Sequence, residues 1–180
     1  MSNKRLIIAL DFKNIDEVSN FISKLDPQKC IAKVGLQLFI SEGPKVLEFL
    51  SHKGFEIFLD LKLHDIPNTV KKSVEEISQY NVKLTTIHLQ GGRDMIQAAN
   101  EAKGDTKILG VSLLTSLDDS DTRELYNNDF KKQFDNLILA WSSPNPRDHF
   151  YKTVFGRTYA EQQQHEIEQY GPEKEEKVNG

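Results

Sequence analysis

Charged residues cluster in one short segment of the chain, at residues 60–69. The segment reads D-L-K-L-H-D-I-P-N-T and follows the apolar run 55–59. Asp60 and Lys62 are two positions apart, so on a β-strand they project from the same side. Keeping both charges at a half-buried strand end is costly, which makes the pair a candidate for charge-based chemistry. A lone D-x-K can equally be a surface ion pair, but the ten-residue pattern is far more specific.

Other polar residues stand in or directly after apolar runs, which recur at steady intervals. The runs are 6–10, 31–35, 55–59, 84–89 and 108–114, and the polar residues are Asp11, Lys33, Asp60 with Lys62, His88 and Thr115. Successive units are 22 to 28 residues long. That length fits one strand, one helix and two loops.

The segments between these runs predict helices. Apolar residues recur at helical spacing in 15–25, 70–77, 95–99 and 130–141. We expect Asn14 to cap the first helix and Thr69 the third. Pro44 lies near the start of the second helix, and Gly54 follows its last apolar residues.

Near-continuous apolar strands that alternate with helices indicate a parallel sheet covered by helices. A barrel and a doubly wound open sheet both fit this pattern. The barrel is favoured because every strand in turn carries a polar residue near its carboxyl end, and a (β/α)₈ barrel collects those ends into one pocket. An open sheet would need such residues only near its switch point. The Gly-rich nucleotide fingerprint is absent after the first run, where residues 11–14 read D-F-K-N.

Composition narrows the function classes. The net charge is -4, and residues 161–180 alone carry six acidic and two basic residues, so the rest is balanced. No basic stripe suggests nucleic acid or an anionic membrane as a partner. Cys30 is the single cysteine, which excludes an intrachain disulfide and suits a core position. No stretch is apolar enough to span a membrane, so we expect a soluble, cytoplasmic protein. The mean hydropathy of -0.52 indicates that part of the chain is not packed.

Residues 5–141 resemble the orotidine 5'-phosphate decarboxylase family. The resemblance rests on segments 6–11, 33–35, 60–69, 88–92 and 114–117. Segment 60–69 is similar to the whole family signature. Related phosphosugar barrels share D-x-K-x-x-D but usually lack the I-P-N-T that follows. A related barrel enzyme that uses a divalent metal remains an alternative.

The resemblance implies removal of carbon dioxide from orotidine 5'-phosphate, giving uridine 5'-phosphate in de novo pyrimidine biosynthesis. It implies no cofactor and no metal. Lys62 would protonate the ring carbanion, Asp60 would lie near the departing carboxylate, and Lys33 would help to hold Lys62 in place. Asp65 would reach the partner's site in a homodimer.

The resemblance also implies a substrate-binding set. Asp11 would bind the ribose hydroxyls, Lys33, Thr69 and Thr115 would complete the pocket, and Gly156 with Arg157 would bind phosphate. We expect His88 to form a hydrogen bond at the barrel mouth and His64 to pack, neither of them being catalytic.

The C-terminal part departs from the family pattern. We predict two regions, an N-terminal part of the barrel at 1–141 and a divergent polar tail at 142–180, with a remnant last strand at 152–157. The expected fold class is therefore α/β of the (β/α)₈ TIM-barrel type, incomplete at about five to six β/α units, with strands 6 and 7 missing. The alternative to an active enzyme is an inactive truncated or frameshifted remnant of it.

Overall fold

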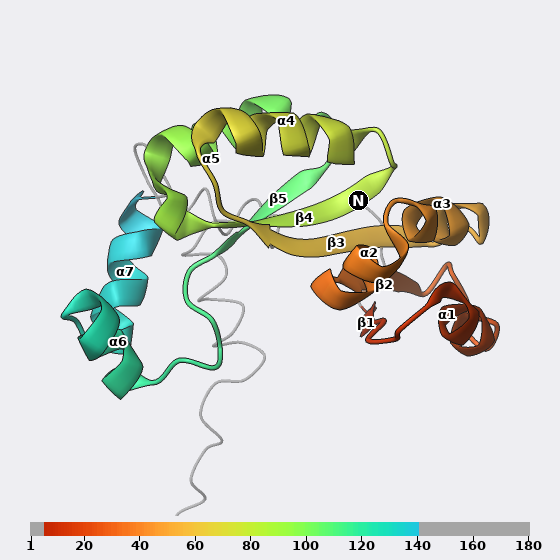
Figure 1. The fold of residues 1–180 in the computed structure, drawn as a ribbon, viewed down its shortest axis with the longest axis horizontal. Coiled ribbons are helices and arrows are strands. Elements are labelled where there is room, and N and C mark those ends of the chain that lie inside the picture. The colour runs from red at the N-terminus through yellow and green to blue at the C-terminus, as the bar shows by residue number, and fades with distance from the viewer. Residues whose placement is uncertain (1–5, 141–180) are drawn as a thin grey trace, which may run out of the picture.

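The computed structural model describes residues 6–140, in which strands and helices alternate (Figure 1). The strands are β1 (Leu6–Ala9), β2 (Cys30–Gly35), β3 (Glu56–Leu63), β4 (Val82–His88) and β5 (Lys107–Val111). The helices are α1 (Ile15–Ile22), α2 (Leu36–Glu42), α3 (Lys45–His52), α4 (Pro67–Ser78), α5 (Gly92–Ala102), α6 (Asp119–Tyr126) and α7 (Phe130–Ala140), with the 3₁₀ turn η1 at Leu89–Gly91. All five predicted strands are confirmed.

The five strands form one parallel sheet in the order β1-β2-β3-β4-β5. Helices α4 and α5 lie side by side over β3, β4 and β5, whereas α1, α2 and α3 lie near β1, β2 and β3 (Figure 1). Because all strands run in one direction, their carboxyl ends meet at one edge of the sheet. The sheet thus gathers the polar strand ends that the sequence predicted.

Two apolar clusters hold the sheet to its helices. One joins β1, β2 and β3 to α1, α2 and α3, with Leu47 and Leu59 almost fully buried. The other joins β4 and β5 to α4, α5 and α7 and centres on Ile87 and Met95. Buried threonines tie neighbouring strands together, because the Thr85 hydroxyl donates to the Leu59 carbonyl at 3.0 Å.

Local signals predicted some helix ends and not others. Asn14 caps α1, since its side chain accepts a hydrogen bond from the Glu17 amide at 2.9 Å. Pro44 is the N-cap residue of α3, as expected. The expectation that Thr69 caps a helix is wrong, because α4 begins at Pro67 with Ile66 as its N-cap. Proline suits the first helical position because its φ is preset and it has no amide hydrogen to satisfy.

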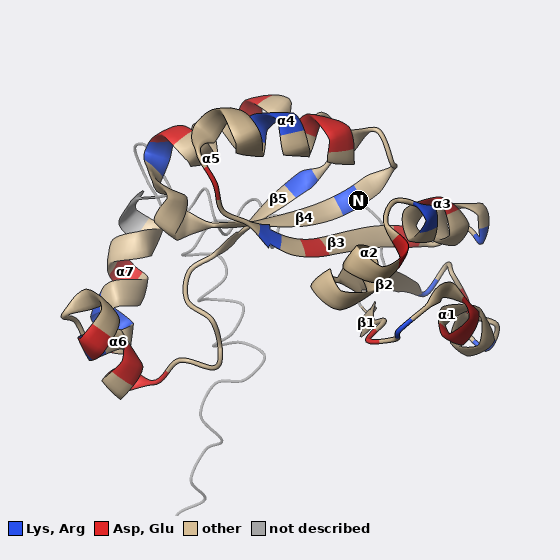
Figure 2. Cartoon of the chain, viewed as in Figure 1, with Lys and Arg blue, Asp and Glu red and all other residues tan. Residues whose placement is uncertain are grey.

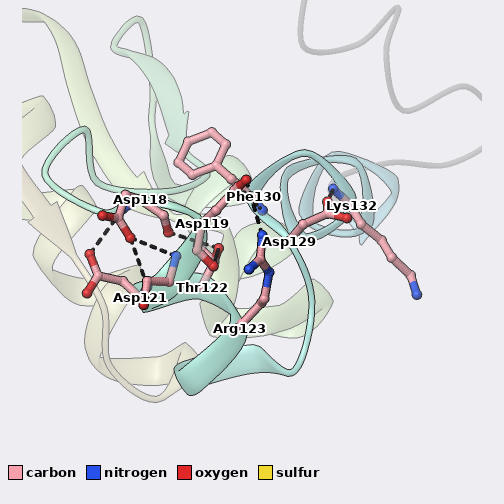
Figure 3. A network of polar contacts seen from close by, with 9 residues as sticks. Asp118, Asp119, Asp121, Thr122, Arg123, Asp129, Phe130 and Lys132 are labelled. Carbon is pink, nitrogen blue, oxygen red and sulfur yellow. Dashed lines mark hydrogen bonds and ion pairs between the residues drawn. The ribbon is translucent and has the colours of Figure 1, made fainter.

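Helices α6 and α7 follow β5 and are joined by a local polar network (Figure 3). Asp118 accepts hydrogen bonds from the amides of Ser120 at 2.7 Å and Asp121 at 3.0 Å, and the Asp121 carboxylate accepts from the Asp118 amide at 3.0 Å. This reciprocal pair is a capping box. Asp119 then accepts from the Phe130 amide at 3.0 Å, which ties the start of α7 to α6.

Acidic and basic residues are interspersed over the described helices (Figure 2). None of the helices described is long and apolar enough to cross a membrane.

Candidate active site

The carboxyl-terminal half of β3 departs from a regular strand. In its pairing with β4, Leu59 lies opposite Thr85 and Leu63 lies opposite Ile87. Between these two pairs β3 advances by four residues, whereas β4 advances by two. The extra residues form a bulge, in which Lys62 adopts a φ of 52°. A residue with a Cβ rarely takes this left-handed conformation, and it does so at a cost.

Asp60, Lys62 and Lys33 form a charged cluster on β3 and β2. The Lys62 ammonium donates to both oxygens of Asp60, at 3.0 Å and 2.9 Å. Lys33 Nζ lies 3.7 Å from Asp60 Oδ2. The Asp60 side chain is only 14% exposed, while Lys33 is 24% and Lys62 39% exposed. A carboxylate at this depth thus has two ammonium partners.

Thr86 of β4 completes this cluster, and it was not among the site residues predicted from the sequence. Its hydroxyl donates to Asp60 Oδ1 at 2.9 Å and accepts from the Lys62 amide at 2.9 Å. The signal in the sequence is a pair of threonines, 85 and 86, inside an apolar run. One of the two must project from the same face of the sheet as Asp60, because neighbouring residues of a strand point to opposite faces.

The surroundings of Asp60 keep it ionised. Burial on its own would raise the pKa of this carboxyl. Hydrogen bonds from Lys62 and Thr86, with the positive charges of Lys62 and Lys33, outweigh burial and hold the pKa below its ordinary value. The cluster is therefore a fixed arrangement of one negative and two positive side chains, in which an ammonium can be presented to a developing negative charge.

Two histidines lie beside the cluster. The rings of His64 and His88 are 5.4 Å apart between centroids. Burial, with the nearby charges of His64 and Lys62, lowers the pKa of His88. The expected hydrogen bond of His88 is not found at Nδ1, which is buried without a partner among the described residues. His64 directly follows β3 and is exposed.

The other predicted site residues lie at the same edge but do not join the cluster. Asp11 is exposed after β1, and its Oδ1 would lie 3.8 Å from a Cβ added at Gly35. Asp65 is exposed in the loop after β3 and accepts a hydrogen bond from the Ile66 amide at 2.7 Å. Thr69 lies in the first turn of α4, and Thr115 follows β5. Both threonines are exposed.

Two further predicted residues, Gly156 and Arg157, lie outside the described residues, as does the strand predicted at 152–157. Within residues 6–140, no group of three or more His, Cys, Asp or Glu side chains could hold a metal ion.

An apolar groove of about 390 Å³ runs along β3 as well. It is lined by Leu59, Leu61 and Leu63, which alternate with the charged residues, and by side chains of α2, α3 and α4. Asp60 and Lys62 do not line it, so it is separate from the charged cluster.

The chain is similar to known proteins of one family. The model of the Orotidine 5'-phosphate decarboxylase / HUMPS family matches residues 4–168. The chain belongs to this family. An orotidine 5'-phosphate decarboxylase of Ligilactobacillus salivarius is 47% identical over 127 residues, covering 66% of this chain and 54% of that protein. One from Wigglesworthia glossinidia brevipalpis is 34% identical over 163 residues, covering 81% and 70%.

Solved structures of family members support the fold class. A decarboxylase structure from Lactobacillus acidophilus superposes with a TM-score of 0.73 at 30% identity, covering 84% of this chain and 77% of that one. One from Thermotoga maritima gives a TM-score of 0.59 at 26% identity, covering 76% and 63%. The predicted α/β fold of the TIM-barrel type is thereby confirmed, and so is the predicted family. The chain spans about half the length of most of the curated relatives that it matches.

Proposed function

We propose that this chain decarboxylates orotidine 5'-phosphate to uridine 5'-phosphate, a step of de novo pyrimidine biosynthesis, with Lys62 as the proton donor. One observation carries the proposal. In a member of this family, the Lys62 ammonium is held by both oxygens of a half-buried Asp60, beside Lys33, at the carboxyl edge of the sheet. This arrangement suits a reaction that develops negative charge on carbon.

The proposed reaction breaks the bond between the pyrimidine ring and its carboxylate. Carbon dioxide leaves, and the electron pair of the broken bond stays on the ring carbon. The Lys62 ammonium stabilises this charge and then transfers its proton to the carbon. Asp60 lies beside the departing carboxylate and keeps Lys62 charged until the transfer. The proposed step uses no cofactor and no metal.

The remaining predicted residues take binding roles in this proposal. Asp11 holds the ribose hydroxyls, Thr69 and Thr115 line the pocket, and Gly156 with Arg157 binds the phosphate. Binding energy from the phosphate serves the transition state even though it lies far from the reacting carbon. In this proposal, residues 1–141 form the barrel part and residues 142–180 a separate tail.

We also propose a cytoplasmic homodimer in which Asp65 enters the partner's site. Its support is local, because large apolar side chains are exposed around the same strand ends. Leu36 after β2 is 55% exposed, Ile40 on α2 is 74% exposed, and Ile66 beside Asp65 is 66% exposed. Leu36 and Ile40 lie one turn apart on α2, and exposed apolar residues gathered in this way often mark an interface.

The test is turnover of orotidine 5'-phosphate by the purified chain, followed by its ultraviolet absorbance. Lys62→Ala should lower kcat at least about a hundredfold, since it removes the proton donor. Lys83→Ala is the matched control, because Lys83 on β4 contacts Asn81 at 3.0 Å and not the cluster. An active wild type with an equally active Lys62→Ala variant would contradict the role of Lys62. Loss of turnover in excess chelator would favour the metal-dependent phosphosugar alternative.

A second candidate is a catalytically inactive form of the family. Within the described residues, β1 and β5 each pair on one side only, so the sheet has two open edges. Open edges favour pairing with other chains. This candidate expects no turnover and a broad, ligand-insensitive melting curve. A sharp melting transition that rises with added uridine 5'-phosphate would count against it.

A further inference from the structure

The backbone of Lys62 needs a partner to hold it in place. Its φ of 52° lies in the left-handed region, at a bulge where the regular pairing of β3 with β4 is interrupted. In that interrupted stretch, the Lys62 amide donates to the Thr86 hydroxyl at 2.9 Å. A side chain of β4 therefore takes the place of a ladder hydrogen bond.

The same hydroxyl also orients the carboxylate. Thr86 Oγ1 is 2.9 Å from Asp60 Oδ1, and the residue is only 4% exposed. The directions of the two bonds are fixed, because an amide can only donate and an ionised carboxylate can only accept. The Thr86 hydroxyl thus accepts a hydrogen bond from the Lys62 amide and donates one to the Asp60 carboxylate.

These contacts close a ring of three residues. Asp60 binds the Lys62 ammonium with both oxygens, Lys62 binds Thr86 through its amide, and Thr86 binds Asp60 through its hydroxyl. A positioned acid loses rate when it is displaced by a fraction of a bond length. The ring restricts both the side chain and the backbone of Lys62.

We propose that Thr86 is a positioning residue of the decarboxylation site, whose hydroxyl fixes the Lys62 backbone and the Asp60 carboxylate in one geometry. The role rests on the proposed function. Thr86 acts through its two partners and does not touch the reacting atoms.

Thr85 offers a matched control one residue away. It is fully buried, and its hydroxyl donates to the Leu59 carbonyl at 3.0 Å and not to the Asp60 carboxylate. Thr85→Val and Thr86→Val remove the same group from the same strand and keep the same shape. Any difference between them reports on the contacts of Thr86 with Asp60 and Lys62.

The first measurement is steady-state kinetics on the full chain. Thr86→Val should lower kcat about ten- to hundredfold with KM changed less than about threefold, because a buried hydrogen bond to a charged group is lost. Thr86→Ser should restore most of kcat, since it keeps the hydroxyl. Thr85→Val should keep kcat near the wild-type value. Equal kcat in Thr86→Val and Thr85→Val would overturn the proposal.

The second measurement does not need activity. The Asp60 carboxyl is titrated by carbon-13 NMR, with Asp60→Asn used for assignment. Thr86→Val should raise the pKa of Asp60 relative to the wild type, because a hydrogen bond that lowers it is gone. Thr85→Val and Thr86→Ser should leave the pKa of Asp60 at its wild-type value. An unchanged Asp60 titration in Thr86→Val would overturn the role of Thr86.

The two measurements separate the two proposals. A wild type without turnover defeats the proposed decarboxylation, while the Asp60 titration still decides whether the Thr86 hydroxyl holds the Asp60 carboxylate. If Thr86→Val does not fold, Thr86→Ser and Thr86→Ala form a second pair that differs in the hydroxyl. Thr86→Ala should then show the lower kcat and the higher pKa of Asp60, and equal values in the two variants would overturn the proposal.

Discussion

Two polar networks in this chain use the same residue types to different ends. The cluster of Asp60, Lys62, Lys33 and Thr86 joins β2, β3 and β4, and Thr86 lies 26 positions from Asp60 in sequence. In the network of α6 and α7 around Asp118 and Asp119, each contact spans at most 11 positions (Figure 3). One is assembled by the tertiary fold, and the other by neighbouring turns of the chain.

Burial separates the two networks further. The Asp60 side chain is 14% exposed, whereas the Asp119 side chain is 60% exposed and its partner Arg123 is 64% exposed. Exposed local pairs contribute little and are replaceable. A half-buried carboxylate with two ammonium partners depends on each of them. This chain thus places its half-buried charges where strands end and its exposed, locally paired carboxylates where helices begin.

The largest difference between the two networks is expected when one aspartate in each is replaced by a neutral residue. Asp60→Asn leaves Lys33 and Lys62 side by side without their carboxylate, and turnover should fall at least about a hundredfold. Asp119→Asn should change kcat less than about twofold. Parallel kinetic assays check both. Equal losses would show that the two networks do not differ in function.

The contribution of Asp60 to the free energy of unfolding should depend on pH. The folded-state pKa of Asp60 lies below its ordinary value, so the ionised carboxylate stabilises the fold above that ordinary range. This contribution is lost as the pH falls through the folded-state pKa. The free energy of unfolding of the wild type should exceed that of Asp60→Asn near neutral pH, and the gap should shrink towards about pH 3.

Urea unfolding across that pH range measures the gap. The same series with Asp119→Asn is the control. A gap that widens on acidification would contradict the assigned direction of the Asp60 shift.

The smallest change in stability is expected when the capping box of α6 is removed. Asp118→Ala should lower the free energy of unfolding by about 1 kcal/mol, because two amides at the start of α6 lose their acceptor. Asp118→Asn should recover most of this loss, as asparagine also caps helices. Thermal melting checks the pair, and kcat should stay unchanged in both. A loss of turnover in Asp118→Ala would mean that α6 and α7 support the site.

The regular part of the fold could be predicted because each unit repeats one pattern. Each of the five apolar runs forms a strand, and Asn14 caps α1 as its side chain suggests. Helix α2 was missed since it follows β2 at once, with Gly35 as an N-cap that forms no side-chain bond. Helix α6 was also missed, although Asp118 and Asp121 have the spacing of a capping box.

The site was predictable in its residue types but not in its geometry. Asp60, Lys62 and Lys33 follow from strand ends, because parallel strands must bring these ends together. Thr86 could not be chosen over Thr85 without the register of β3 and β4, and the bulge that sets this register has no marker residue. Sequence periodicity assumes a regular strand, so it also missed the left-handed backbone of Lys62.

That left-handed backbone sets stability against chemistry at position 62. Glycine takes a positive φ without strain, whereas alanine pays the same Cβ penalty as lysine. Both substitutions remove the ammonium, so Lys62→Gly should be more stable than Lys62→Ala by about 1 kcal/mol. Relief of the backbone at residue 62 is therefore opposed by the loss of an ammonium partner of the half-buried Asp60, so strain and charge act on stability in opposite directions at this one position.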